Sequence, residues 1–263
     1  MKIDGKTALY LVAGDPIAQV KSPGLYTEWC VAHGVNAVFV PFHIDAAEGA
    51  PVLDALRHVP NLAGLIVTIP FKPLAADHCQ MLSPRARAAG AVNVVRPIGG
   101  GQWAGDALDG IGCVAALRAR GIAVSGATVQ LVGAGGAGAS VAAALAEAGA
   151  ARLSVDDLDP GRAADLAGRL RREFPGVETG IGRIDPQEVT IFVNASPAGM
   201  AEGDPLPIDP GDLGPGKLLV EMIMQPARTR LLAAAEAAGC VVVPGREVLD
   251  GQVTETLRFF DLN

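Results

Sequence analysis

Short apolar runs alternate with longer stretches of helical periodicity along most of this sequence. Most of the runs are uninterrupted, which is typical of parallel strands that are buried on both faces. We expect strands at residues 9–13, 37–41, 65–69, 129–132, 153–155, 191–194, 218–221 and 241–243, and helices at 23–33, 46–57, 138–148, 161–173, 227–238 and 247–260. Strands that alternate with helices in this way predict an α/β fold with parallel sheets.

The pattern falls into two α/β blocks followed by one helix. With 263 residues, the chain is long enough for two modest domains. We expect a first α/β domain at 1–110, a Rossmann-type domain at 111–240 and a C-terminal segment at 241–263, whose helix returns to the first domain. The three glycines at 99–101 separate two apolar runs and predict a hairpin or another tight connection.

Composition and charge exclude several classes of protein. Lys and Arg number 21 and Asp and Glu 28, and the resulting net charge of −7 predicts no general attraction to nucleic acid or to an anionic membrane. The four cysteines, Cys30, Cys79, Cys113 and Cys240, lie far apart and form no CxxC pair, so neither a zinc site nor a disulfide framework is indicated. The four histidines form no HxxxH pair, and we expect no metal.

One uncharged stretch, residues 121–146, is long enough to span a bilayer. Five glycines interrupt it, and its first part is typical of a strand and its later part of a helix. A turn between the two would leave backbone polar groups unpaired in lipid, so we do not interpret it as a membrane span. The apolar run near the N-terminus is too short for a signal peptide, and a cytoplasmic protein is the simplest expectation.

The strongest generic motif is a glycine-rich turn between a predicted strand and a predicted helix. The motif reads Gly133-Ala-Gly135-Gly-Ala-Gly138. Its glycines allow a tight turn and a close approach of the backbone to a pyrophosphate, while the helix N-terminus offers N–H groups to the anion. Such a match taken alone is also compatible with a glycine-rich turn that binds nothing.

Carboxylates follow the next predicted strand. Asp157 lies 19 residues beyond Gly138, the spacing at which an acidic residue binds the adenosine ribose hydroxyls of NAD. Asp156 and Asp159 lie beside it, with Arg162 as the cation near them in the sequence, and three carboxylates would repel a 2′-phosphate. The sequence therefore predicts NAD in preference to NADP. For Asp159, capping of the following helix is an equally good interpretation.

Further polar side chains follow apolar runs elsewhere in the first block. Thr68 and Lys72 come at the end of one run, Asn93 follows a second, and Asp106 and Asp109 follow a third. Ligands of open α/β sheets bind beyond the carboxyl ends of the strands, where Thr68, Lys72, Asn93 and Asp109 could converge. A lysine suits proton transfer better than an arginine, because the pKa of its amine can shift when it is partly buried. Lys72 could equally be a solvated loop residue, and Asp106 and Asp109 could be turn formers.

Together with further motifs, these residues resemble those of the shikimate dehydrogenase and quinate/shikimate dehydrogenase family. The resemblance covers nearly the whole chain, which is similar to a divergent member of the family. Seven family motifs occur in order: Val20-Lys-Ser22-Pro23, Ile66-Val-Thr68-Ile-Pro70-Phe71-Lys72, Ala89-Gly-Ala-Val-Asn93, Gly105-Asp106-Ala-Leu-Asp109-Gly110, the loop at 133–137, the segment Asn194–Met200, and the pair Gly245 and Gln252. Seven ordered matches are far more specific than any single motif.

The resemblance implies an oxidoreductase with a substrate domain at 1–110 and an NAD-binding domain at 111–240. It would transfer a hydride reversibly between the nicotinamide and the C3 hydroxyl or ketone of shikimate, quinate or a related cyclic hydroxy acid, in aromatic amino acid biosynthesis by the chorismate pathway. Lys72 and Asp109 would handle the proton, since oxidation of an alcohol releases one. We expect a monomer or a homodimer whose partner is this small-molecule substrate.

The same matching implies the remaining site residues. Substrate would be bound by Ser22, Thr68, Asn93, Met224 and Gln252. Coenzyme would be bound by Gly133, Ala134, Gly135, Gly136, Ala137, Asp157, Asp159, Asn194, Ser196, Met200, Met222 and Gly245. NADP-using members of the family carry Asn-Arg-Thr where this chain has Asp157-Leu158-Asp159, and the missing arginine is a second reason to expect NAD.

Several positions depart from the family pattern and leave the substrate open. Val20 replaces a serine, Ile66 an asparagine, Ala107 and Leu108 an Asn-Thr pair, and Met224 a tyrosine that touches the substrate in many members. A pocket that loses hydrogen-bonding partners can lose orders of magnitude in discrimination. The alternatives are therefore a dehydrogenase of the same scaffold for a different hydroxy acid, or a sensor that binds a nucleotide or metabolite without catalysis.

Overall fold

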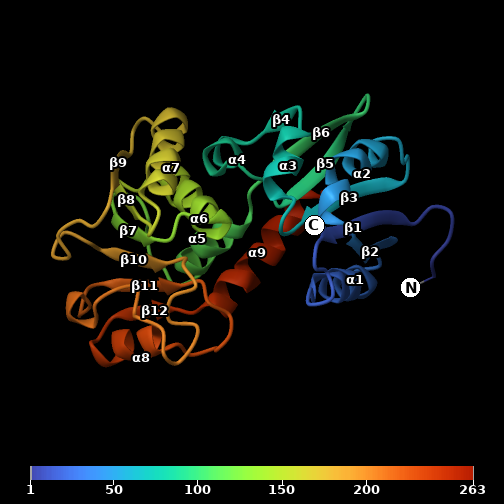
Figure 1. The fold of residues 1–263 in the computed structure, drawn as a ribbon. Coiled ribbons are helices and arrows are strands. Elements are labelled where there is room, and N and C mark those ends of the chain that lie inside the picture. Colours follow the sequence, from blue (N-terminus) through green and yellow to red (C-terminus); the bar gives the residue numbers. More distant parts are fainter. Residues whose placement is uncertain (1, 263) are drawn as a thin grey trace. The chain divides into compact units, whose positions relative to one another are not determined.

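The computed structural model describes residues 2–262, which form two compact units, and each unit is built on its own sheet (Figure 1). Unit 1 runs to Ala86 and also contains Gly90–Ala107 and the segment from Thr256 onward. Unit 2 contains Arg87–Ala89 and Leu108–Glu255. This mixed α/β architecture confirms the predicted fold class.

The sheet of unit 1 has six strands in the order β2-β1-β3-β5-β6-β4. Their bounds are β1 (Ala8–Gly14), β2 (Ala37–His43), β3 (Leu62–Val67), β4 (Met81–Leu82), β5 (Val94–Gly99) and β6 (Gln102–Asp106). β1 pairs in parallel with β2 and β3, whereas β5 is antiparallel to both β3 and β6. The carboxyl ends of β1 and β3 therefore meet at one edge of this sheet.

The helices of unit 1 depart from the predicted ones in detail. They are α1 (Ser22–Ala32), the 3-10 turn η1 (Ala46–Glu48), α2 (Gly49–Leu56), α3 (Lys72–Asp77) and α4 (Pro84–Ala89), of which the last three residues belong to unit 2. The helix expected at 46–57 is thus a 3-10 turn followed by α2, where Asp45 caps the turn by accepting a bond from Ala47 N. α3 and α4 were not predicted, because six residues are too few to show helical periodicity.

The glycines at 99–101 form the turn between β5 and β6, as predicted. Their φ angles are 91°, 60° and 71° for Gly99, Gly100 and Gly101. These left-handed values are easily adopted by glycine and cost other residues energy. The turn therefore depends on all three glycines.

The end of the chain contributes to the core of unit 1. The ring of Phe260 lies 4.9 Å from that of Tyr10, which in turn stacks on Phe39 at 4.4 Å. A Cβ atom on Gly64 would fall 2.5 Å from the Phe260 ring, so a glycine in β3 makes room for this side chain. The contact confirms that the C-terminal helix returns to the first domain, and it does so through its last residues.

The sheet of unit 2 is fully parallel, with six strands in the order β12-β11-β10-β7-β8-β9. Its strands are β7 (Thr128–Val132), β8 (Arg152–Asp156), β9 (Glu178–Ile181), β10 (Ile191–Asn194), β11 (Leu218–Glu221) and β12 (Val241–Val243). The order reverses between β7 and β10, as in doubly wound nucleotide-binding folds, whose ligands bind outside the carboxyl ends at that point.

The helices of unit 2 are α5 (Asp109–Ala119), α6 (Gly136–Glu147), α7 (Pro160–Glu173), α8 (Arg230–Ala237) and α9 (Gly245–Phe259), with the 3-10 turn η2 (Pro210–Asp212). α5 packs very closely against two of them through glycines. A Cβ on Gly110 would fall 2.0 Å from the Ser140 oxygen of α6, and one on Gly112 would fall 2.1 Å from the Val248 oxygen of α9. The sequence analysis did not predict α5, because these glycines are poor helix formers and weaken the helical pattern.

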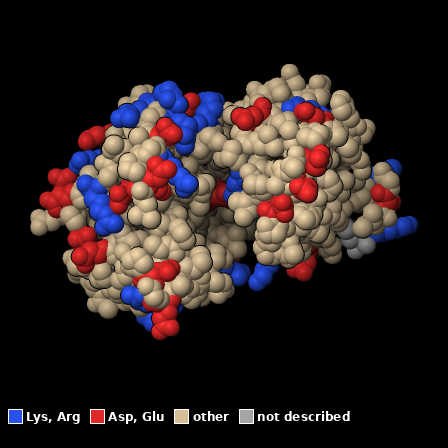
Figure 2. Space-filling model, in the orientation of Figure 1, with Lys and Arg blue, Asp and Glu red and all other residues tan. Residues whose placement is uncertain are grey.

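Charged side chains of both signs are interspersed over the visible faces, and basic ones gather over α7 (Figure 2). Arg171 and Arg172 lie in the last turn of α7, where cations interact favourably with the helix dipole. Within residues 2–262, no helix has the length and apolarity needed to cross a bilayer. The same part of the chain contains no cluster of His, Cys, Asp and Glu that could hold a metal ion.

Candidate active site

In unit 1, the loops that leave β1 and β3 pack directly against each other. Thr68 N donates to Ala13 O at 2.9 Å, and Asp15 N donates to the oxygen of Ile69 at 2.9 Å. A Cβ on Gly14 would fall 2.3 Å from Thr68 Cγ2, so a glycine is required at the end of β1. Thr68 is therefore fixed at the carboxyl edge of the sheet.

Backbone hydrogen bonds bring two further predicted residues to this edge. Val67 N donates to the oxygen of Asn93 at 2.7 Å, and Lys72 O accepts a bond from Val92 N at 3.0 Å. Asn93 is almost fully buried and Lys72, the first residue of α3, is half-buried. Thr68, Lys72 and Asn93 are thus gathered at one end of unit 1, whereas Ser22 lies at the start of α1.

Asp106 has a structural partner of its own in unit 1. Its carboxylate, which is 8% exposed, accepts two bonds from the guanidinium of Arg85, at 2.9 Å from Nε and 2.5 Å from Nη2. Ser83 Oγ and Ala107 N also donate to it, at 2.5 and 2.7 Å. Four donors satisfy this carboxylate, which anchors the end of β6. The motif positions that follow, Ala107 and Leu108, are buried and apolar.

In unit 2, two predicted site residues that are 143 positions apart form a hydrogen bond. Gln252 Nε2, on α9, donates to Asp109 Oδ1, at the start of α5, at 2.9 Å. Close packing of α5 on α9 makes this contact possible, because Gly112 and Gly251 let the helix backbones approach. The bond orients the Asp109 carboxylate. Asp109 belongs to unit 2, whereas Lys72 belongs to unit 1.

The glycine-rich loop has the geometry that a dinucleotide requires. Gly133 has a φ of 102°, and a Cβ there would fall 2.8 Å from the carbonyl of Ala195. A Cβ on Gly138 would fall 1.9 Å from Gly133 O, so this glycine allows α6 to start directly behind the loop. Gly135 and Gly136 are exposed and have open space beside them. The first turn of α6 can therefore present backbone N–H groups to a pyrophosphate, and the residues fit a nicotinamide dinucleotide.

The loops after β10 and β11 are joined by a buried network. Asn194 Oδ1 accepts bonds from Ser196 N at 3.0 Å and Ser196 Oγ at 2.7 Å, while Asn194 Nδ2 donates to Glu221 Oε1 at 2.9 Å. A Cβ on Gly245 would fall 3.1 Å from Met222 O, so the start of α9 packs onto the same region. The structure thus gathers Asn194, Ser196, Met222 and Gly245, and Met200 and Met224 are exposed on the two loops.

Glu221 is a residue of this region that the sequence analysis missed. It is fully buried, and this burial raises the pKa of its carboxyl to about 7, against hydrogen bonds from Ile223 N, Thr229 and Asn194 that lower it. The available signal was an acidic residue at the end of an otherwise apolar strand. Glu221 was instead counted as the last residue of that strand.

The carboxylates after β8 are paired. Arg183 Nε donates to Asp156 Oδ2 at 2.8 Å, and Asp157 accepts bonds from Ala134 N at 2.6 Å and Asp159 N at 2.9 Å. Asp159 caps α7 by accepting a bond from Gly161 N at 2.9 Å, which is the capping role considered above.

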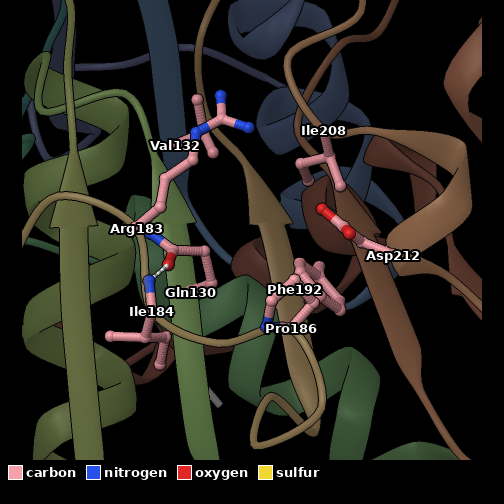
Figure 3. A pocket seen from close by; sticks show the side chains of 8 residues that line it. All are labelled: Gln130, Val132, Arg183, Ile184, Pro186, Phe192, Ile208 and Asp212. Atoms are coloured by element: carbon pink, nitrogen blue, oxygen red, sulfur yellow. Dashed lines mark hydrogen bonds between the residues drawn. The ribbon is translucent and has the colours of Figure 1, made fainter.

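A cavity of about 220 Å³ lies beside Arg183, on the face of β7 and β10 (Figure 3). Its walls are mostly apolar, and they include Val132, Phe192 and Ile208. Three polar residues also line it, Gln130, Arg183 and Asp212, and Gln130 Oε1 already accepts a bond from Ile184 N at 3.0 Å (Figure 3). Because the walls are mostly apolar and Gln130 and Arg183 already have partners in the protein, the glycine-rich loop is the better candidate for a dinucleotide site.

Known proteins resemble this chain over almost its full length. The sequence model described as the shikimate dehydrogenase substrate binding domain matches residues 12–95. A shikimate dehydrogenase (NADP(+)) of Rubrobacter xylanophilus is 36% identical over 98% of this chain and 92% of its own length. The chain belongs to the shikimate dehydrogenase family. The resemblance expected from the motifs is thereby confirmed.

Two further members of the family support this assignment. A shikimate dehydrogenase (NADP(+)) of Acidiphilium cryptum is 35% identical over 95% of this chain and 88% of its own length. The crystal structure of shikimate 5-dehydrogenase from Listeria monocytogenes, in complex with shikimate and NAD, has a TM-score of 0.91 and 26% identity, and covers 100% of this chain and 94% of that one. The two-domain α/β fold is therefore that of the family.

The predicted preference for NAD over NADP is wrong. The curated relatives from R. xylanophilus and A. cryptum, and two others, are named as NADP(+) enzymes. The prediction treated the carboxylates after β8 as uncompensated charges with Arg162 as the only cation near them. The structure pairs Asp156 with Arg183, which is 27 positions away in the sequence, and surrounds Asp157 with backbone donors.

Proposed function

We propose that this protein is a shikimate dehydrogenase that oxidises a ring hydroxyl of shikimate reversibly with NADP(+). The names of the curated relatives support both the substrate and the coenzyme. The observation that carries the proposal is the hydrogen bond between Gln252 and Asp109, because it joins a residue expected to bind substrate to one expected to handle the proton.

Unit 1 would bind the substrate and unit 2 would bind the coenzyme. Thr68 and Asn93 of unit 1 are hydrogen-bonding side chains at one sheet edge and would bind the hydroxyls and carboxylate of the substrate. The loop at 133–137 of unit 2 would hold the pyrophosphate, and the loops after β10 and β11 would hold the other half of the coenzyme. When bound, the coenzyme supplies the hydride acceptor.

Lys72 would take the proton that the hydroxyl releases as its carbon is oxidised. In the reverse direction, the Lys72 ammonium would return that proton to the new alkoxide. Asp109 would bind and orient the reacting groups through its carboxylate, whose own orientation is set by Gln252. This division of labour follows from the chemistry, because an alcohol must lose a hydride and a proton together.

The test is an assay of reduced coenzyme formed from shikimate, with NADP(+) and NAD supplied separately. We expect Lys72→Ala to lower kcat by roughly 10²–10⁴-fold, the usual contribution of a positioned proton-transfer group. Lys6→Ala is the matched control, since Lys6 is exposed in a turn near the N-terminus, and it should leave kcat unchanged. Equal rates for the two variants would remove Lys72 from the reaction.

A second substrate is favoured by one specific feature. Met224 is 40% exposed on the loop after β11 and offers a thioether where many family members offer a tyrosine hydroxyl. Quinate or another cyclic hydroxy acid would then be used in preference to shikimate. We expect the double change Val20→Ser and Met224→Tyr to raise kcat/KM for shikimate, and an unchanged value would place the substrate preference elsewhere. The retained Lys72 and Asp109 favour an enzyme over a non-catalytic sensor.

A further inference from the structure

The carboxyl of Glu221 lies at the centre of three segments of unit 2, and the proposed chemistry does not use it. Its Oε1 accepts bonds from Asn194 Nδ2 at 2.9 Å and Ile223 N at 3.2 Å, and its Oε2 accepts a bond from Thr229 Oγ1 at 3.1 Å. The side chain is 0% exposed. Burying a carboxyl is costly unless such bonds compensate it, so an apolar residue would serve the core better.

Asn194 links the Glu221 carboxyl to the loop after β10. Because Asn194 Nδ2 faces Glu221, its Oδ1 faces the loop and accepts bonds from both the N and the Oγ of Ser196. Ser196 Oγ in turn accepts a bond from Ala198 N at 3.3 Å. The amide of Asn194 can thus adopt one orientation, and residues 195–198 are held by it.

The loop after β11 is held at both ends by the same carboxyl. Ile223 is bonded near the start of the loop and Thr229 at its end. The Thr229 hydroxyl donates a hydrogen bond to Glu221 and accepts one from Leu232 N at 3.1 Å, which caps α8. Glu221 therefore connects residues 195–198, residues 222–229 and the start of α8.

We propose that Glu221 is a positioning residue for the coenzyme, which fixes the two loops that carry Ser196, Met200 and Met222 in the arrangement that receives it. This role rests on the proposed function, since it assumes that these loops contact the coenzyme. Glu221 would act through Asn194 and the loop backbone.

The test compares three variants of the full chain. Glu221→Leu removes the acceptors but fills the space, and Glu221→Gln keeps one acceptor oxygen. Leu231→Ala is the matched control, because Leu231 is fully buried in the same unit and its apolar side chain makes none of the hydrogen bonds of the network, so its loss weakens the core of unit 2 and keeps every donor and acceptor. Amide hydrogen exchange is measured without coenzyme, and the Kd of NADP(+) is measured by calorimetry.

In Glu221→Leu we expect exchange at Ser196 and Ile223 to accelerate about tenfold more than in Leu231→Ala, because their bonds depend on the carboxyl. The Kd of NADP(+) should rise about tenfold in this variant. Glu221→Gln should restore both values to within about threefold of the original protein, since its oxygen still accepts from Asn194 and Ile223.

Equal effects of Glu221→Leu and Leu231→Ala on exchange and on Kd would overturn the proposal, as they would show a general loss of stability. If Glu221→Leu does not fold, the test rests on Glu221→Gln. Exchange at Ser196 and Ile223 that is about tenfold faster in Glu221→Gln than in the original protein would also overturn the proposal. Failure of the proposed function is a separate result. It would be seen as binding of NADP(+) by the unaltered protein without oxidation of shikimate, and it would leave the exchange data intact.

Discussion

Removing the ionisable group at Glu221 should change how the stability of unit 2 depends on pH. The carboxyl has a pKa of about 7 in the folded protein, raised by burial from an ordinary value of 4.5. Below pH 4.5 both the folded and the unfolded chain hold the proton. As the pH rises from there to about 7, the unfolded chain loses its proton first, so the free energy of unfolding falls. Well above pH 7 both states are ionised and the loss is complete.

The size of the effect follows from the difference between the pKa values of the folded and the unfolded chain. Each tenfold difference in proton affinity between the two states corresponds to about 1.4 kcal/mol, so the full loss is about 3 kcal/mol, of which about 2–3 kcal/mol falls between pH 5 and pH 8. Glu221→Gln cannot ionise and lacks this component. We therefore expect the free energy of unfolding of the original protein, relative to that of the variant, to fall by about 2–3 kcal/mol between these two pH values.

The assay must report on unit 2 specifically. Both tryptophans, Trp29 and Trp103, belong to unit 1, so their fluorescence does not serve. Hydrogen exchange of the β11 amides at increasing urea concentration gives the free energy of opening at that strand. Because the two proteins are compared at the same pH, the other titrating groups cancel. A difference that stays constant within about 0.5 kcal/mol from pH 5 to pH 8 would refute the reasoning.

Three further results are expected. Gly138→Ala should abolish NADP(+) binding in calorimetry, since its Cβ would fall 1.9 Å from Gly133 O. Asp106→Asn should destabilise unit 1 by about 3 kcal/mol in urea unfolding followed by tryptophan fluorescence, because it leaves the half-buried guanidinium of Arg85 without its carboxylate. Gln252→Ala should lower kcat/KM for shikimate about tenfold in the coenzyme assay, through loss of the bond to Asp109.

The sequence predicted the elements that have strong periodicity, and it indicated candidate site residues next to recognisable motifs, whose roles stay predictions. Five strands of unit 2 (β7, β8, β10, β11 and β12) and the glycine-rich loop are of this kind, because each is local in the sequence, whereas β9 was not predicted. α5 was missed because Gly110 and Gly112 are poor helix formers, and they are present for packing against α6 and α9. This packing joins segments that are distant in the sequence, so the residues around Gly110 and Gly112 do not by themselves indicate a helix.

The electrostatic prediction failed for the same physical reason. Whether the carboxylates after β8 repel a phosphate depends on their partners, and Arg183 reaches Asp156 only because β8 and β9 are neighbours in the sheet. Glu221 was missed because its role depends on Asn194 and Thr229, which come from other segments. Pairing between distant positions has to be read from the fold.

The ring of Phe260 has a consequence for the order in which this protein matures during synthesis. Domains generally fold as units from the N-terminus as the ribosome releases them. Here the first sheet cannot fill the space between Gly64 and Tyr10 until Phe260 has emerged, whereas residues 108–255 are already complete. The unit whose chain is translated first is therefore completed last, because its apolar surface stays open until Phe260, the residue after α9, has been made.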